Sequence, residues 1–490
     1  MSRKKSRSKR KKKTNKKRDI DTDTDTDILP PDDYLPIVFK LPDLTDDIFE
    51  YDMDYQLSKN IEHPLSSLGF QHYLHQSKDK MEMVEHFKGK KKVYYIMHKF
   101  DRYIDNYDND IGGASKSYFN IKSPMKVGGK ASGSQPNILS RAFYKLWELL
   151  FMFDLVQLNK KGFTSAHLAE GPGSFIQATM FYRDMFGKKN ISKNDKYHAI
   201  TIHPDDPYVQ PIDSKFIAYY KKEKPQRIQL HKTYSREISR GSTRKDNGDL
   251  TNPKTIKLFG GKFDNKTIDF ITADGGFKWE NENTQEQEAF RLLLAQIITA
   301  LKIQANGGNF VCKFYETFTD LTIKLICMLS TFYKELYIAK PLMSRKSNSE
   351  RYIVCMGYNS KNKKKIKLLE NMLKDIHKYK GKKHIINIFP EYTIPHDFST
   401  SITKLNTTIA NNQFIRINEM VDFVNKQNYI GEVYQERREM QINASQYWIK
   451  QYFPKKVEHE VSHDNIIQLT ENIIKNNNKK VNLLEKIIKD

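Results

Sequence analysis

Short apolar runs alternate with amphipathic stretches through the middle of the chain. Seven of these runs, rich in β-branched and aromatic residues, predict strands: AHLAEG, HAITIH, RIQLHKT, IDFITAD, NFVCKFY, ELYIAKP and RYIVCMGY. Apolar residues at helical spacing predict helices over 138–155 before the first run, over 175–186 after it, and over 290–301 between the fourth and fifth. The glycine pair at 307–308 is expected to end the last of these helices.

This alternation predicts an α/β fold built on a doubly wound, largely parallel sheet of seven strands. Strand–helix–strand units need right-handed crossovers, which place helices on both faces of the sheet. Because ELYIAKP and RYIVCMGY have no helix between them, the last strand is expected to pair antiparallel. Ligands bind such sheets at the carboxyl ends of the strands, so functional residues are expected along that edge.

The α/β pattern fills residues 131–360, and extensions flank it on both sides. Residues 1–30 join the run KKSRSKRKKK to the repeat DTDTDTD, and because such charge blocks bury nothing we expect a disordered charged tail. An N-terminal extension over 31–130 is expected to be mixed, with helices over 80–87 and 93–107.

A second extension, over 361–490, follows the last predicted strand. It is rich in Lys and Asn and shows helical patterns over 417–428 and 466–489. We therefore expect it to be mainly helical, and no motif in it indicates a particular chemistry.

The charge of the chain points to a polyanionic partner. The formal net charge is +23, and the segment 3–18 supplies 12 Lys and Arg without any acid, so the rest of the chain still carries +11. A basic folded body most often binds nucleic acid and less often an acidic membrane, and a Lys-rich surface that serves only solubility is the remaining alternative. The tail itself fits a nucleic-acid-binding arm, a nuclear-targeting signal or a solvated appendage equally well.

Cysteine usage and hydropathy limit the compartment. Cys312, Cys327 and Cys355 lie in apolar runs without CxxC spacing, so we expect neither a disulfide framework nor a metal site. No apolar run is long enough to span a bilayer, and no apolar segment follows the cationic N-terminus, so neither membrane insertion nor secretion is expected. A reducing compartment such as the cytoplasm fits this composition.

The stretch AEGPGS, residues 169–174, forms the first predicted strand-to-helix turn. Gly171 and Gly173 leave room for a ligand to approach the backbone, and the following helix N-terminus offers free N–H groups. The GxGxxG spacing of dinucleotide-binding turns is absent, which disfavours an NAD-dependent oxidoreductase. Taken alone, the stretch fits an ordinary tight turn as well as a ligand site.

Two charged residues stand at later strand ends. Asp274 directly follows IDFITA and precedes a glycine pair, whereas Lys313 interrupts the otherwise apolar run NFVCKFY. An isolated lysine at such a position would be costly. Lys313 is therefore expected to pair with Asp274 or to take part in chemistry.

Five segments together resemble a known family. LSRAFYKLWELL, AEGPGSFIQ, IDFITADGGF, GGNFVCKFY and SRKSNSERYIVC follow the order and approximate spacing of the FtsJ-like RNA 2′-O-methyltransferases, over about 136–360. The resemblance implies a Rossmann-like sheet that binds S-adenosyl-L-methionine and methylates a ribose 2′-hydroxyl of RNA without a metal. It also implies a catalytic Lys-Asp-Lys-Glu set, here Lys145, Asp274, Lys313 and Glu350.

The resemblance assigns roles within the set and to the cofactor site. Lys313 is implied to be the general base or the group that steers the hydroxyl, with a pKa lowered by burial and by Lys145. Asp274 is implied to orient Lys313, and Glu350 to hold Lys145. The implied cofactor-binding residues are Glu170, Gly171, Pro172, Gly173, Ser174, His203, Asp205, Asp249 and Asp274.

Within the family, ADGGF is more similar to the mRNA cap methyltransferases than to the ribosomal-RNA branch. Capped mRNA is therefore the implied substrate, and subunits of the capping machinery are implied candidate partners. The long flanks and the Lys/Asn bias resemble FtsJ-like proteins of large cytoplasmic DNA viruses, which implies the host cytoplasm or a virion, while the basic tail leaves the nucleus open.

Two other interpretations remain open at this stage. One is an RNA-binding or scaffold protein on an inactive methyltransferase fold, and the other is a ribosomal-RNA 2′-O-methyltransferase. The segment SRKSNSE also departs from the family pattern, because Lys346 stands where proline is common and Asn348 where serine is common. The conformation of that loop is therefore not implied by the resemblance.

Overall fold

A computed structural model describes most of the chain. The described residues are 30–489 except 62–67, 82–83, 85–92, 122–125, 128–129, 132–135, 203–210, 224–225, 232–247, 264–266, 277–280, 360–361 and 380–382. Of these, residues 36–489 belong to one compact unit. The tail predicted over 1–30, much of the helix predicted over 80–87, and the candidate residues His203 and Asp205 lie outside the described residues.

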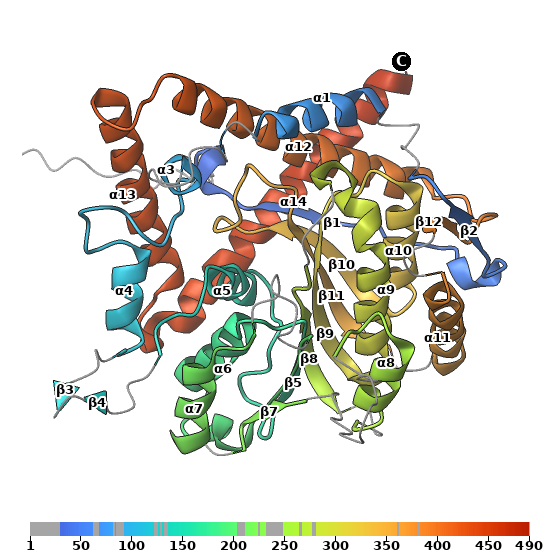
Figure 1. Cartoon of the computed structure of the whole chain (residues 1–490), viewed down its shortest axis with the longest axis horizontal. Helices are drawn as coiled ribbons and strands as arrows, with labels where there is room; N and C mark the ends of the chain where they lie inside the picture. Colours follow the sequence, from blue (N-terminus) through green and yellow to red (C-terminus); the bar gives the residue numbers. More distant parts are fainter. Residues whose placement is uncertain are drawn as a thin grey trace, which may run out of the picture. The chain divides into compact units, whose positions relative to one another are not determined.

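One sheet of eight strands forms the centre of this unit, in the order β1-β10-β11-β9-β8-β5-β6-β7 (Figure 1). The strands are β1 Ile37–Lys40, β5 Thr164–Leu168, β6 Lys196–Ile200, β7 Ile228–Leu230, β8 Ile268–Ala273, β9 Gln304–Phe314, β10 Tyr333–Lys340 and β11 Arg351–Tyr358. In the part of the sheet ordered β9-β8-β5-β6-β7, neighbouring strands pair in parallel. Strand β11 pairs antiparallel with both β9 and β10. The predicted fold class, including an antiparallel last strand, is confirmed.

The prediction of seven strands was one too few. The eighth strand, β1, comes from the N-terminal extension and pairs antiparallel with β10, with Ile37 opposite Lys340. A second short strand of that extension, β2 (Tyr55–Ser58), pairs antiparallel with β12 (His384–Ile388) from the segment predicted to be mainly helical. Strands of four or five residues are too short to show a clear alternation of apolar and polar positions in the sequence. β1 and β2 form here because each pairs with a partner strand.

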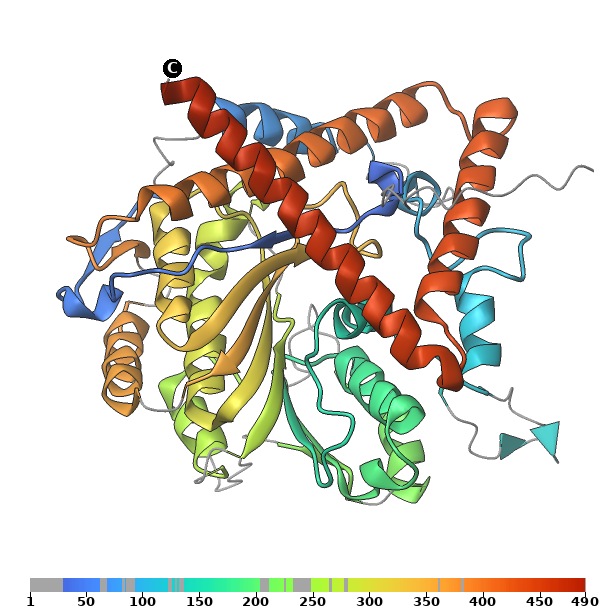
Figure 2. The same cartoon turned by 180° about the vertical axis from the view of Figure 1, so that it is seen from behind.

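Helices cover both faces of the sheet. Their bounds are α1 Leu68–Asp79, α3 Val93–Met97, α4 Ile111–Tyr118, α5 Ala142–Met152, α6 Ser174–Phe186, α7 Ser214–Glu223, α8 Pro253–Gly260, α9 Gln285–Ile303, α10 Asp320–Ser330, α11 Lys363–His377, α12 His396–Asn425, α13 Glu432–Tyr452 and α14 His459–Lys489. Helices α8, α9 and α10 lie on one face, and α5, α6 and the long α14 lie on the other (Figures 1 and 2). None of the helices in the described part is long and apolar enough to cross a membrane.

The N-terminal extension is less helical than expected. The helix predicted over 93–107 ends at Met97, and the segment DRYIDNYDND that follows forms turns instead. Asp110 stabilises these turns, because its carboxylate accepts hydrogen bonds from the backbone N–H groups of Ile104 and Gly113, both at 2.7 Å. Short Asp and Asn side chains compete with a helix in this way.

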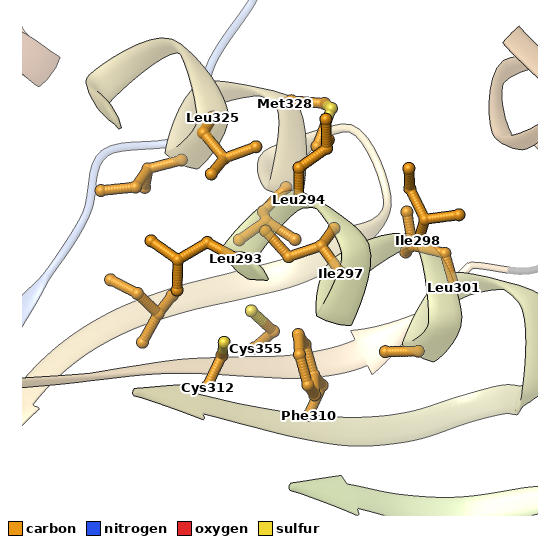
Figure 3. Close-up of a cluster of buried hydrophobic side chains, with 14 of the residues drawn as sticks. Leu293, Leu294, Ile297, Ile298, Leu301, Phe310, Cys312, Leu325, Met328 and Cys355 are labelled. Carbon is orange, nitrogen blue, oxygen red and sulfur yellow. The ribbon is translucent and has the colours of Figure 1, made fainter. Parts of the chain in front are cut away.

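The core between α9 and the sheet explains why the central strands form as they do. Figure 3 shows the apolar face of α9 packed over Phe310, Cys312 and Cys355 of the sheet; the α9 residues labelled there are Leu293, Leu294, Ile297, Ile298 and Leu301. The glycine pair 307–308 does not end α9, because the helix already ends at Ile303 and strand β9 begins directly at Gln304. The helix and the strand thus meet without a loop, which fixes the position of Lys313 further along β9.

Candidate active site

The carboxyl ends of three neighbouring strands meet at one edge of the sheet. The backbone N–H of Glu170, just after β5, donates to the carbonyl of Ile200 in β6 at 3.3 Å. The backbone N–H of Asp274, just after β8, donates to the carbonyl of Leu168 in β5 at 3.3 Å. The AEGPGS turn and the ADGG segment therefore lie side by side, as the parallel topology predicts.

The AEGPGS turn is closed by its own glutamate. The Glu170 carboxylate accepts hydrogen bonds from the backbone N–H groups of Phe175 at 2.8 Å and Ile176 at 3.0 Å, in the first turn of α6. The expectation of free N–H groups at this helix N-terminus was therefore wrong for those two donors. A carboxylate now occupies the position that a phosphate takes in dinucleotide-binding turns.

Burial perturbs the acid–base behaviour of this turn. Burial raises the pKa of Glu170 to about 8, with Asp274 acting in the same direction and the two backbone donors opposing it. His167 lies 4.0 Å from the free Glu170 oxygen, and burial lowers its pKa to about 3, so its imidazole is neutral. A cationic ligand beside Glu170 would favour the ionised carboxylate.

Gly173 and Ser174 shape the turn rather than expose it. Gly173 has a φ of 109°, and an added Cβ would lie 3.3 Å from side-chain carbons of Leu139 and Ile212. The Ser174 hydroxyl lies 2.7 Å from that of Ser140, the residue that precedes Arg141 and α5. The turn after β5 is thereby tied to the helix that carries Lys145.

We expect Gly173→Val to weaken S-adenosylmethionine binding by about tenfold or more, because a β-branched residue strains a backbone at this φ by ~1–3 kcal/mol. Calorimetric titration measures the affinity, and thermal unfolding shows whether the variant is folded. The affinity of Gly173→Ala, which carries a smaller side chain at the same φ, is expected to lie between those of wild type and Gly173→Val. Unaltered affinity in a folded Val variant would place the cofactor elsewhere.

Lys313 and Asp274 form an ion pair at the adjoining strand ends. The Lys313 Nζ lies 3.1 Å from Asp274 Oδ1 and donates to the Asp274 carbonyl at 3.0 Å. Burial alone would lower the pKa of Lys313, but Asp274, Tyr315 and Glu350 raise it above its ordinary value. The expected direction of this pKa was wrong, since the nearby carboxylate outweighs burial, and Lys313 is an ammonium in the free protein.

Lys145 and Glu350 form the second pair of the set. The Lys145 Nζ lies 2.6 Å from Glu350 Oε1 and 2.9 Å from Oε2, and both side chains are largely buried. Burial alone would raise the pKa of Glu350, but Lys145, Lys313 and Lys340 lower it below its ordinary value. The sequence-predicted set is thus brought together as two ion pairs, one from β8 and β9 and one from α5 and the start of β11.

A third lysine, not predicted from the sequence, lies beside the set. Lys340, at the end of β10 and only 3% exposed, donates to the carbonyl of Glu350 at 2.6 Å and to Asn348 Oδ1 and the Asn348 carbonyl, both at 2.9 Å. This explains the unusual Asn348, whose amide oxygen reaches a donor that a serine would not reach in the same way. The missed signal was a lysine in the apolar run ELYIAKP.

The loop 341–350 is also held from α5. The Glu148 carboxylate, buried below Lys145, accepts from the backbone N–H groups of Leu342 at 2.6 Å and Met343 at 2.9 Å. Arg141 donates to the Met343 carbonyl at 2.5 Å, and Ser344 donates to Glu350 Oε1 at 2.7 Å. The loop that departs from the family pattern therefore has an ordered, hydrogen-bonded conformation.

Asp249 is placed beside the second strand end. Gly248, with a φ of 78°, packs so closely on the carbonyl of Thr201, just after β6, that an added Cβ would lie 2.3 Å from it. Asp249 accepts hydrogen bonds from the backbone N–H of Thr251 at 2.9 Å and from its hydroxyl at 2.7 Å. The GDLT segment thus lies next to the end of β6, and Asp249 is one of the residues that the resemblance assigns to the cofactor.

The donor set at this edge fits a cationic cofactor better than an anionic one. Glu170 and Asp274 bring two carboxyl groups to neighbouring strand ends, and Glu170 blocks the helix N-terminus that a pyrophosphate would need. S-adenosylmethionine carries a sulfonium and an ammonium group, whereas NAD carries a pyrophosphate. In the described part of the chain, no group of three or more His, Cys, Asp or Glu side chains could hold a metal ion.

The sheet order agrees with the Rossmann-like fold that the family resemblance implies. Residues 138–358 match the FtsJ-like methyltransferase family.

Three relatives illustrate this similarity. The cap-specific mRNA (nucleoside-2′-O-)-methyltransferase 1A of Caenorhabditis briggsae is 30% identical over 215 residues, which cover 42% of this chain and 24% of that protein. The cap-specific mRNA (nucleoside-2′-O-)-methyltransferase 2 of Drosophila melanogaster is 28% identical over 262 residues, 52% of this chain and 35% of that protein. An uncharacterized protein of Acanthamoeba polyphaga mimivirus is 29% identical over 268 residues, 54% of this chain and 31% of that protein. The chain thus spans about a quarter to a third of the length of these relatives.

Proposed function

We propose that this protein transfers a methyl group from S-adenosylmethionine to a ribose 2′-hydroxyl of RNA, at a nucleotide next to the mRNA 5′ cap. The observation that carries the proposal is the pairing of Lys313 with Asp274 and of Lys145 with Glu350 at one edge of the sheet. The cap-specific names of the relatives support the choice of substrate. An inactive scaffold would have no need of two lysines buried at this edge.

The cofactor would be held by the turn around Glu170, by the GDLT segment at Asp249 and by the strand end at Asp274. When bound, it supplies an electrophilic methyl group that is already activated by the sulfonium. The protein's own task is then to position the acceptor oxygen and to receive its proton, and good positioning is worth up to ~7–11 kcal/mol.

Lys313 is suited to position the acceptor oxygen. As an ammonium it donates a hydrogen bond to the 2′-oxygen and leaves an oxygen lone pair free for the methyl group. The hydroxyl proton becomes strongly acidic as the new C–O bond forms, so a weak base is sufficient to receive it. Asp274, 3.1 Å from the Lys313 Nζ, is the nearest carboxylate and takes that role.

Lys145 and Glu350 complete the acceptor side. Lys145 brings a second ammonium group to the site, where it favours the approach of RNA phosphate and ribose oxygens, and Glu350 fixes its orientation through both carboxylate oxygens. We propose that His203 and Asp205 contribute to the ribose of the cofactor, as the family resemblance implies. Subunits of a capping machinery are proposed partners, and the cytoplasm, including a virus-infected one, is the proposed location.

Mass spectrometry of RNA after reaction tests the function directly. Capped and uncapped transcripts of one sequence, and ribosomal RNA in a separate reaction, are incubated with the full chain and methyl-labelled S-adenosylmethionine, and the digested nucleosides are identified. We expect label on the ribose of a cap-proximal nucleotide of the capped transcript. Label at internal positions of ribosomal RNA alone would support the ribosomal-RNA alternative, and no label on any RNA would support an inactive scaffold.

Cofactor affinity should depend on pH through Glu170. Because its pKa is raised to about 8, the carboxyl is mostly protonated near neutrality, and a cationic cofactor must displace that proton on binding. The affinity should therefore rise from about pH 6 towards pH 8 and then level off. Calorimetry across this pH range measures the affinity for wild type and Glu170→Gln. Titration of the cofactor itself affects both proteins equally, so the difference between the two profiles reports on Glu170. Identical pH profiles would show that Glu170 does not face the cofactor.

A further inference from the structure

A cationic cleft lies on the outer side of α9, between α8 and α11, and has a volume of about 570 Å³. These three helices contact one another on one face of the molecule (Figure 1). The basic residues that line the cleft are Lys254, Lys257, Lys302, Lys367, Lys374 and His377. None of them belongs to the charged set at the sheet edge or to the proposed cofactor site.

The charge of the cleft is not balanced by its own residues. Glu370 is the single acidic residue of the described lining; it pairs with Lys302 and lies 3.7 Å from Lys367. Within the described chain, Lys254, Lys257 and Lys374 have no carboxylate within ion-pair distance. Concentrated like charge in a concave surface raises the local potential and favours an anionic ligand.

The chemistry of the lining selects the kind of anion. Among the described residues, the apolar lining is aliphatic, with the buried Ile256, Ile298 and Leu373, and includes no Phe, Tyr or Trp ring on which a base could stack. The described lining also includes no arginine, whose fork would read a base edge or a carboxylate in two directions. Lysines act as point charges on phosphate groups, so this lining fits a phosphodiester backbone without reading its bases.

The cleft also lies close to the proposed catalytic edge. The Gln296 side chain of α9 accepts a hydrogen bond from the backbone N–H of Gly275, next to Asp274, at 3.1 Å. Ile298 and Lys302 follow two and six residues later on α9, which is only ~3 and ~9 Å further along the helix axis. Because both residues lie on the other side of α9 from Gln296, an RNA strand held at the acceptor site must pass around the helix, which is ~10 Å across, to reach the cleft.

We propose that the cationic cleft binds the phosphate backbone of single-stranded RNA, at nucleotides outside the one that is methylated. The inference rests on the proposed function and extends it, because α11 lies beyond the segment that matches the family. The C-terminal extension then serves to lengthen the RNA-binding surface. Contacts with phosphates alone make the binding independent of sequence and sensitive to salt.

The test uses the full chain with Lys254→Glu and Lys257→Glu combined. Lys254 lies in the first turn of α8, where an acidic residue is favourable to the helix, and Lys257 lies in the last turn, where an acidic residue costs only ~0.3–1 kcal/mol, so the variant is still expected to fold. Lys189→Glu with Lys193→Glu is the matched control, because both lysines are exposed and lie outside the cleft and the site. A milder pair, Lys254→Gln with Lys257→Gln, serves if the Glu variant is unstable.

Fluorescence anisotropy is measured with a capped tetranucleotide and with a capped RNA of about 20 nucleotides, across a salt series. For the longer RNA we expect an affinity about tenfold lower than wild type and a salt slope smaller by about 1.4, since each lost phosphate contact contributes ~0.7. Binding and methylation of the tetranucleotide should remain as in wild type. The control variant should change the affinity for either RNA by no more than about twofold.

The outcomes separate the two proposals. If wild type methylates the tetranucleotide but the cleft variant binds the longer RNA normally, the cleft proposal is wrong and the proposed function stands. An equal loss in the control variant would reduce the effect to overall charge and also overturn the cleft. If an acidic peptide such as polyglutamate binds wild type through these lysines and the longer RNA does not, the partner is a protein. No methylation of any capped RNA by wild type would overturn the proposed function itself.

Discussion

Turnover of Lys313→Ala is expected to fall by ~10³-fold or more, because the substitution removes both the orientation of the acceptor oxygen and the ammonium group beside it. The affinity for S-adenosylmethionine should stay within about threefold of wild type, since Lys313 acts on the acceptor rather than on the cofactor. Single-turnover methyl transfer to a capped RNA measures the first quantity, and calorimetry measures the second.

Lys196→Ala is the matched control for this variant. Lys196 lies at the start of β6, at the opposite edge of the sheet, and is exposed, so its removal should leave both quantities unchanged. Turnover near wild type in Lys313→Ala would remove this lysine from the chemistry. A loss of cofactor affinity as large as the loss of turnover would instead assign Lys313 to the cofactor site.

Lys340→Met is expected to lower turnover by ~10²-fold with little change in global stability. The substitution removes the hydrogen bonds to Asn348 and to the Glu350 carbonyl, so the loop that carries Glu350 shifts, and small displacements of reacting groups cost about this much. Burial lowers the pKa of Lys340 well below its ordinary value, which shows that the buried charge is itself costly. Removing the buried charge should offset the loss of the hydrogen bonds, so the free energy of unfolding should change by no more than about 1–2 kcal/mol.

Comparing the effects of Lys340→Met on turnover and on stability shows whether Lys340 positions Glu350 or is needed for folding. Steady-state kinetics on a capped RNA and urea unfolding of the same preparations measure both, and Lys334→Met on the exposed side of β10 is the control. A turnover within about twofold of wild type would show that the loop holds Glu350 without Lys340. A fall in turnover that only parallels a large loss of stability would make Lys340 a structural residue.

The order of elements and the pairing of Asp274 with Lys313 could be predicted because local pattern carries them. Each central strand is a buried run bounded by polar residues, and parallel topology brings the ends of successive strands to one edge, so Asp274 and Lys313 had to lie near each other. Lys145 and Glu350 were found by family resemblance, since 205 residues separate them and no local period links them.

The pKa of Lys313 and the state of the AEGPGS turn could not be predicted in the same way. Both depend on distances of a few ångströms between groups far apart in the chain: Asp274 outweighs burial at Lys313, and Glu170 folds back onto α6. Coulombic interactions and desolvation act in opposite directions and are of similar size, so only coordinates decide the sign.

The sequence by itself determined the α/β class, the seven central strands, the antiparallel last strand and the residues that form the charged set, because periodicity, strand ends and ordered motifs are local properties of the chain. Tertiary structure alone decided that β1 extends the sheet, that β2 pairs with β12, that Lys340 holds the loop before Glu350, and that lysines of α8, α9 and α11 share one cleft. Each of these depends on pairings between distant segments, whose free energy arises only when the folded backbone brings unpaired strand edges, buried carbonyls and like charges together.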